Sequence, residues 1–191
     1  TVKAVATGLD SGQVYFYRFA CDGVSSPVGK TRTLPTGQLG KLGLALASCS
    51  NYAFGYFNAY NAIANDEAID FVLHLGDYIY EYSATGWGAE TALSLNRAHT
   101  PINEIVSLQD YRERHAQYKA DPDSQRMHAA KPLLLVWDDH ESTNNLVRFL
   151  SFLRKKNGRH YAKDPLWKPP QNYNIGWRRS CKGLHVVVTK H

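Results

Sequence analysis

The sequence predicts an α/β protein in which part of a βαβ sheet domain follows the last strands of a separate β domain. Residues 1–35 contain only short β-like segments, separated by glycine, serine and proline. Further along, two apolar runs of strand length flank a segment with helical spacing, and a third apolar run follows two more helical segments. Uninterrupted apolar strands of this kind are typical of a parallel sheet.

Residues 1–35 are expected to be the end of a β-sandwich. Residues 2–7 and 14–20 have strand-like composition, and residues 30–33 are a further strand. Three strands cannot bury two faces by themselves, so we expect earlier strands to precede them. Residues 34–41 then form the linker to the next unit.

The βαβ unit begins with an apolar strand at residues 42–48. A helix is predicted at residues 57–64, and a second apolar strand at residues 70–77 ends in Gly-Asp. Residues 83–101 are rich in serine, glycine and threonine and are predicted to be a long connection.

Two helices and a third strand complete this unit. Residues 102–119 are predicted to be helical, and Asp121-Pro122-Asp123 ends that helix and caps another that runs to Ala130. Residues 132–136 form the third apolar strand. The charged face of the first helix, expected to be solvated, comprises Asp110, Arg112, Glu113 and Arg114.

The net charge of +5 averages two regions of opposite sign. Residues 1–145 hold 11 basic and 16 acidic side chains, whereas residues 146–191 hold 11 basic side chains and one acidic. We expect the basic region to be a divergent, solvated and disordered tail. The alternative is that it binds nucleic acid or an anionic surface through interleaved basic and aromatic residues: Arg154, Lys155, Lys156, Trp167, Tyr173, Trp177, Arg178 and Arg179.

The remaining composition excludes several classes of protein. The absence of 18 consecutive apolar residues excludes a membrane-spanning helix, and the first residues lack a signal-peptide pattern. The cysteine spacing indicates neither a zinc site nor a framework of several disulfides. Cys21 and Cys181 are predicted to be small buried side chains, and the odd number of cysteines leaves at least one thiol unpaired.

Polar side chains follow each of the three apolar strands. Cys49 follows the first, Asp77 the second, and Asp138, Asp139 and His140 the third. The carboxyl ends of strands in an open α/β sheet form its ligand crevice, so we expect these side chains to converge. Considered one at a time, these residues have ordinary structural explanations, such as an aspartate in a turn or a cysteine in the core.

Carboxylates brought together at one sheet edge need a cation to offset their repulsion. Tyr80, three positions after Asp77, adds a phenol to the donor set. A mixture of thiolate, phenolate, carboxylate and imidazole fits a hard iron with a second, oxygen-preferring divalent ion. Two such ions indicate phosphoester hydrolysis. His74, inside the second strand, is instead predicted to be a buried structural histidine bonded to the backbone.

These segments resemble the alkaline phosphatase D (PhoD) family of calcineurin-like metallophosphoesterases. The resemblance covers residues 1 to about 145, in the family's order. The matching segments are Ala47-Ser48-Cys49, Gly55 to Tyr60, Phe71 to Tyr82, Leu108 to Arg114, and Trp137 to Glu141 with Asn144-Asn145.

The resemblance implies an iron(III) and calcium site that cleaves phosphomonoesters and phosphodiesters, using a metal-activated hydroxide for in-line attack on phosphorus. Asp77 would bridge the metals, Tyr80 would bind iron(III), and Cys49 would be the ligand from the first strand. Asp139 would bind the calcium-like ion, and His140 would contact the phosphoryl group or its leaving oxygen.

The resemblance also implies the surroundings of this site. Residues 1–35 would be the last strands of a fibronectin-like domain, and residues 42–145 the N-terminal part of the metallophosphoesterase sandwich. The protein would be secreted or periplasmic.

After Asn145 the motif-by-motif resemblance ends. His160, His185 and His191 lack the spacing of the superfamily's closing motif, and no role is transferred to them. The alternative hypothesis is therefore a catalytically inactive remnant of such an enzyme, truncated or shifted in reading frame near residue 145.

Overall fold

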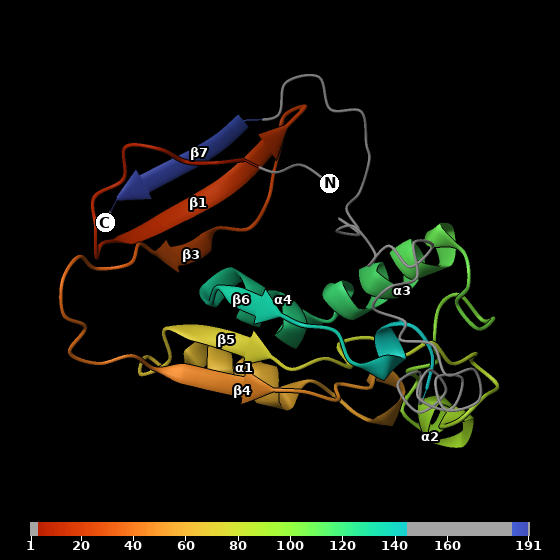
Figure 1. Cartoon of the computed structure of the whole chain (residues 1–191). Coiled ribbons are helices and arrows are strands. Elements are labelled where there is room, and N and C mark those ends of the chain that lie inside the picture. Colours follow the sequence, from red (N-terminus) through yellow and green to blue (C-terminus); the bar gives the residue numbers. More distant parts are fainter. Residues whose placement is uncertain (1–3, 145–184, 191) are drawn as a thin grey trace, which may run out of the picture.

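The computed structural model describes residues 4–144 and 185–190 of the 191-residue chain. Two separate sheets dominate the fold, and the helices lie on the side of the second sheet (Figure 1). Among the described residues, every helix is too short or too polar to cross a membrane.

The first sheet is antiparallel and centred on β1 (Val14–Cys21). The short strand β2 (Val24–Ser25) and the strand β3 (Gly29–Arg32) pair with one edge of β1. The strand β7 (His185–Lys190) pairs with the other edge, along Tyr15 to Ala20. The predicted strands at 14–20 and 30–33 are therefore confirmed.

Three expectations for the chain ends need correction. Residues 4–7 are irregular, so the predicted strand at 2–7 is wrong over its described part. Residues 185–190 of the expected solvated tail are a strand, because β1 has an open edge with which they pair. The basic and aromatic residues 154–179, His160, His191 and Cys181 lie outside the described residues. Cys21 is disulfide-bonded and partly exposed rather than a buried thiol.

The second sheet is parallel, as the sequence predicts. Its order is β4 (Leu44–Ala47), β5 (Phe71–His74) and β6 (Leu133–Leu135). In register, Ala45 lies beside Val72, and Val72 lies beside Leu133. The helix α1 (Asn58–Asn65) connects β4 to β5 and confirms the βαβ unit.

Three further helices surround this sheet. They are α2 (Ala89–Ser94), α3 (Leu108–Ala120) and α4 (Pro122–Ala130). Helix α3 begins later than predicted because Ser107 and Asp110 form a capping box. The predicted cap at Asp121 is confirmed, since its carboxylate accepts from the backbone N–H groups of Asp123 and Ser124. Helix α2 lies inside the predicted connection and was not predicted.

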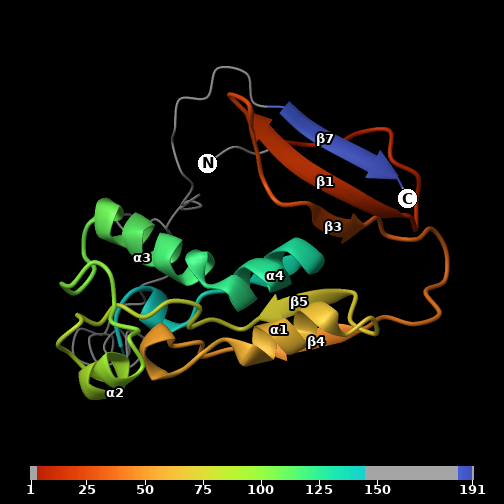
Figure 2. The same ribbon diagram turned by 180° about the vertical axis from the view of Figure 1, so that it is seen from behind.

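The core lies between the parallel sheet and helices α1 and α4, which pack against each other (Figures 1 and 2). Every second residue of a strand faces the core, as Ala45 of β4 and Val72 of β5 do. Leu44, Leu46 and Leu134 are exposed, so in the described part of the chain the sheet is covered on one face only. The buried residues at the centre of the core are Ala45, Phe57, Tyr60, Val72, Tyr78, Ile79, Ile105, Tyr118 and Met127.

The expected solvated face of α3 is wrong at Arg114. This side chain is fully buried, and its guanidinium donates to backbone carbonyls of two loops. Arg112, on the same helix, is exposed as predicted. The four carbonyls that accept from Arg114 belong to Tyr80, Tyr82, Thr100 and Pro101.

Candidate metal centre

The carboxyl ends of the three parallel strands meet at one edge of the sheet. The backbone N–H of Cys49 donates to the carbonyl of Gly76 at 3.2 Å, and that of Ser50 to the carbonyl of Asp77 at 2.9 Å. Gly76 has a φ of 104°, and a Cβ there would lie 2.5 Å from the backbone nitrogen of Asp138. Glycine at 76 is therefore what allows the tips of β5 and β6 to touch.

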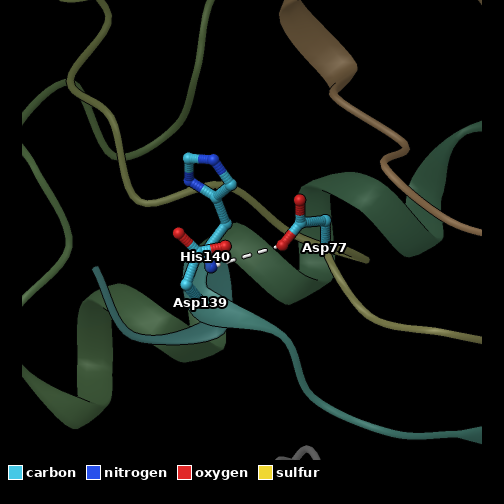
Figure 3. Close-up of side chains that lie close together, drawn as sticks. All are labelled: Asp77, Asp139 and His140. Atoms are coloured by element: carbon cyan, nitrogen blue, oxygen red, sulfur yellow. Dashed lines mark hydrogen bonds between the residues drawn. The ribbon is translucent and has the colours of Figure 1, made fainter. Parts of the chain in front are cut away.

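Three predicted site residues form a compact group. Asp77, Asp139 and His140 each offer a ligand atom, and these atoms all lie within 4.8 Å of one another. Figure 3 shows the backbone N–H of His140 directed at Asp77 Oδ1, with an N···O distance of 3.3 Å. Asp77 comes from the tip of β5, whereas Asp139 and His140 come from the 3₁₀ turn η2 (Asp139–Glu141) after β6.

The other two predicted ligands approach the second oxygen of the same carboxylate. Cys49 Sγ lies 3.6 Å from Asp77 Oδ2, and the Tyr80 hydroxyl donates to that oxygen at 3.3 Å. Cys49 is an exposed free thiol, whereas Asp77 and Tyr80 are buried. Cys49 and Asp77 both have a positive φ, at 56° and 53°. All five predicted residues are thus brought to one place, and Asp77 is in contact with or close to the other four.

Electrostatics at this edge favour a bound cation. Burial raises the pKa of the Tyr80 phenol well above its usual value, and the Asp77 carboxylate and Cys49 thiol raise it further. The phenol is therefore neutral in the chain alone. A cation bound among Asp77, Asp139 and Cys49 would instead lower the pKa of the phenol. The donor atoms brought together are carboxylate oxygens, an imidazole nitrogen, a phenol oxygen and a thiol sulfur, all of which are ligand types for metal ions.

Glu141 joins the two loops that carry the acidic ligands. This buried carboxylate accepts from the backbone N–H groups of Asp77 at 2.9 Å and Asp138 at 2.7 Å through Oε2. Its Oε1 accepts from Tyr78 at 2.6 Å and Ile79 at 3.4 Å. Burial raises the pKa of Glu141, and the N–H donors act in the opposite direction. Glu141 therefore ties the loop of Asp77 to η2, in addition to the bond from the His140 backbone N–H to Asp77.

We expect Glu141→Gln to lower the free energy of unfolding by roughly 2–3 kcal/mol, because an amide NH₂ would face two backbone N–H donors. Urea denaturation would measure this loss. The exposed Glu67 provides the matched variant, and Glu67→Gln is expected to stay within about 0.5 kcal/mol of the unmodified chain. Equal stability of both variants would show that Glu141 does not join the loops.

Glu81 orients the imidazole of His140. Its Oε2 lies 2.8 Å from His140 Nδ1, and its Oε1 accepts from the backbone N–H of Asn144. The imidazole also lies against the ring of Tyr80, with ring centroids 4.3 Å apart and the ring planes tilted by 32°. The contact with Glu81 favours a proton on Nδ1, so Nε2 is the nitrogen that can act on a substrate.

Sequence reasoning assigned no role to Glu81 and Glu141, although both lie within the matched motifs. The sequence did offer a signal, because Glu81 directly follows Tyr80 and Glu141 directly follows His140. The prediction for His74 is correct about burial and wrong about its partner. Its Nε2 lies 2.8 Å from the hydroxyl of Tyr60 and 3.4 Å from that of Ser50, so side chains rather than backbone bind it.

Comparison with known proteins places both parts of the chain in one family. The family model for the PhoD-like phosphatase matches residues 44–163. The model for the PhoD-like phosphatase N-terminal domain matches residues 1–35. The first of these matches extends beyond residue 145, where the resemblance by motifs ends, so the expectation of no family match there is wrong up to residue 163.

Individual relatives agree with the family models. Alkaline phosphatase D of Bacillus subtilis (strain 168) is 46% identical over 147 residues, which are 76% of this chain and 24% of that protein. A solved structure described as the structure of PhoD has a TM-score of 0.63 and 45% identity, over 72% of this chain and 26% of its own. The chain therefore spans about a quarter of the length of these relatives.

Proposed function

The chain belongs to the PhoD-like phosphatase family, and from this premise we propose that it is a metal-dependent phosphoric ester hydrolase acting on phosphomonoesters and phosphodiesters. One observation carries the proposal. The carboxylates of Asp77 and Asp139 and the imidazole of His140 come from two different strand ends and lie within 4.8 Å of one another. Such a set can hold cations and, through them, a phosphoryl group.

The residues present fit two metal ions of different hardness. Cys49, Asp77 and Tyr80 would hold iron(III), since a buried phenol gives up its proton most readily to a trivalent ion. Asp139, sharing Asp77, would hold calcium, which prefers oxygen ligands. When bound, such ions supply a water nucleophile of lowered pKa and stabilise negative charge on the phosphoryl oxygens.

The protein's own contribution is proton transfer and positioning. With Nδ1 held by Glu81, His140 presents Nε2 to a phosphoryl oxygen or to the leaving oxygen. Glu141 ties the loop of Asp77 to η2, so it would help to keep the residues that would hold the metals close to His140.

Hydrolysis of a chromogenic phosphomonoester and a phosphodiester at alkaline pH, with iron and calcium supplied, tests the function. We expect the chain to bind both metals and Asp77→Asn to lower turnover by at least about 100-fold and to weaken metal binding. Metal analysis after gel filtration and protection of Cys49 from alkylation by iodoacetamide give readouts that need no turnover. Asp66→Asn, at an exposed position, is the matched control.

The outcomes separate the two hypotheses about this chain. Metal binding that Asp77→Asn weakens, without hydrolysis, would favour a non-catalytic remnant. A chain that binds no metal, with Cys49 equally reactive in its presence and absence, would contradict the site itself. The calcineurin-like arrangement of the domain, the fibronectin-like character of residues 1–35 and a secreted or periplasmic location belong to the same proposal.

A further inference from the structure

A cavity of about 480 Å³ lies directly beside the candidate metal centre. It is formed by the tip of β4, the 3₁₀ turn η1 (Tyr52–Phe54) and helix α1. Its volume is that of sites that hold small organic molecules. Cys49 lines the cavity and also lies 3.6 Å from the Asp77 carboxylate, so the cavity and the metal centre share a wall.

The lining of this cavity is apolar and aromatic with a few hydroxyl and amide groups. Phe54, Tyr56 and Phe57 supply the rings, and Ser50 and Asn51 supply polar atoms. Within the described part of the chain, no lysine, arginine, aspartate or glutamate lines it. An uncharged occupant is therefore favoured over one that carries a second phosphate, because a charge here would be desolvated without a partner.

A row of aromatic rings connects His140 to the rim of the cavity. The ring centroids of His140 and Tyr82 are 5.4 Å apart, those of Tyr82 and Trp87 are 5.5 Å apart, and those of Trp87 and Phe54 are 4.4 Å apart. Phe54 belongs to both features, since it ends the row and lines the cavity. The row therefore begins at the residue proposed to act on the leaving oxygen.

Large rings of the row and of the cavity lining are exposed, although neighbouring groups contact them. Trp87 and Tyr56 are each 59% exposed and Phe54 is 40% exposed, which is unusual for large rings beside one another. A Cβ at Gly88 would lie 2.5 Å from the Phe54 ring, so glycine at 88 lets Phe54 lie against the start of α2. The hydroxyl of Tyr56 donates to the carbonyl of Leu95. These rings form a preorganised surface for a flat apolar group.

We infer that the cavity and the aromatic row bind the leaving group of the phosphoester, and that they favour an uncharged aromatic leaving group over a small aliphatic one. The inference rests on the proposed function, because it takes the phosphoryl group to lie among Asp77, Asp139 and His140. A ring bonded to a leaving oxygen at His140 would lie along the row toward Trp87 and Phe54, and Phe54 also lines the cavity together with Tyr56. Stacking on such rings is favourable for any planar group.

The test compares hydrolysis of phenyl phosphate and ethyl phosphate by the full chain. We expect Trp87→Ala and Tyr56→Ala to lower kcat/KM for phenyl phosphate by about tenfold and to leave that for ethyl phosphate within about twofold. Because each variant is compared with the unmodified chain for each ester, the intrinsic difference between the esters cancels. Leu93→Ala, at an exposed position of α2 outside the row, is expected to change neither.

A binding experiment decides the inference even without turnover. In saturation-transfer NMR, phenol is expected to bind the unmodified chain and Leu93→Ala, and to lose this binding in Trp87→Ala. Equal losses of kcat/KM for both esters, or phenol binding that Trp87→Ala leaves unchanged, would overturn it. A chain that hydrolyses neither ester but binds phenol in this manner would contradict the proposed function and keep the aromatic subsite.

Discussion

Arg114→Met is expected to lower the free energy of unfolding by roughly 4 kcal/mol, which is a large part of the stability of a small domain. The guanidinium is fully buried and donates to four backbone carbonyls. Methionine fills a similar volume but donates no hydrogen bond, so each carbonyl loses its partner at a cost of about 1 kcal/mol. The carbonyls of Tyr80 and Tyr82 are among them, so the loop after Asp77 would also lose its anchor.

Urea denaturation followed by circular dichroism measures this loss of stability. Two further variants show whether the loss comes from the hydrogen bonds of the buried guanidinium. Arg112→Met, at an exposed position of the same helix, is expected to stay within about 0.5 kcal/mol of the unmodified chain. Arg114→Lys keeps the charge but not the planar fork of donors, and we expect an intermediate loss. If Arg114→Met were as stable as Arg112→Met, the carbonyls would not depend on the guanidinium.

The candidate site was predictable because its geometry follows from parallel strands. Cys49, Asp77 and Asp139 lie far apart in the sequence, yet each follows an apolar strand, and the ends of parallel strands meet. No further tertiary information was needed to bring them together. The role of Glu141 was not predictable in this way, because it depends on how four backbone N–H groups are oriented.

The missed features depend on contacts between segments that carry no periodic pattern. Arg114 has polar neighbours on its helix, and its burial comes from two loops that approach from 80–82 and 100–101. The strand β7 was missed because its partner β1 lies more than 160 residues earlier in the chain, as a pairing such as Phe16 with Thr189 shows. The segment 4–7 has strand-like composition, but composition does not supply a pairing partner.

Acidification below about pH 6.5 is expected to destabilise the chain through two buried histidines, His74 and His99, and two half-buried ones, His115 and His128. Burial lowers the pKa of His74, His99 and His128 to about 4, and that of His115 to about 3. All four are neutral in the folded chain at pH 6, whereas in the unfolded chain they bind protons below their ordinary pKa of about 6.5. Stability is therefore complete above that pH and falls as the pH decreases toward 4.

Hydrogen bonds to two of these histidines act in the same direction as burial. Nε2 of His74 lies 2.8 Å from the Tyr60 hydroxyl, and Nε2 of His128 lies 2.8 Å from the Tyr78 hydroxyl. Burial raises the pKa of Tyr60 to about 12 and also raises that of Tyr78, so these phenols keep their protons and donate to the imidazoles. A protonated imidazole has no acceptor to offer and would lose this bond.

The expected loss at pH 5 is about 2 kcal/mol for each histidine, so we predict cooperative acid unfolding near roughly pH 5. Urea denaturation at pH 8, 6.5 and 5 measures it. His115→Phe isolates one contribution, because the buried Nδ1 of His115 has no hydrogen-bond partner among the described residues and its ring stacks on Tyr78. We expect this variant to lose about 2 kcal/mol less than the unmodified chain between pH 8 and pH 5. Equal losses in the two proteins, or stability that is constant from pH 8 to 5, would mean that His115 gains its proton without unfolding.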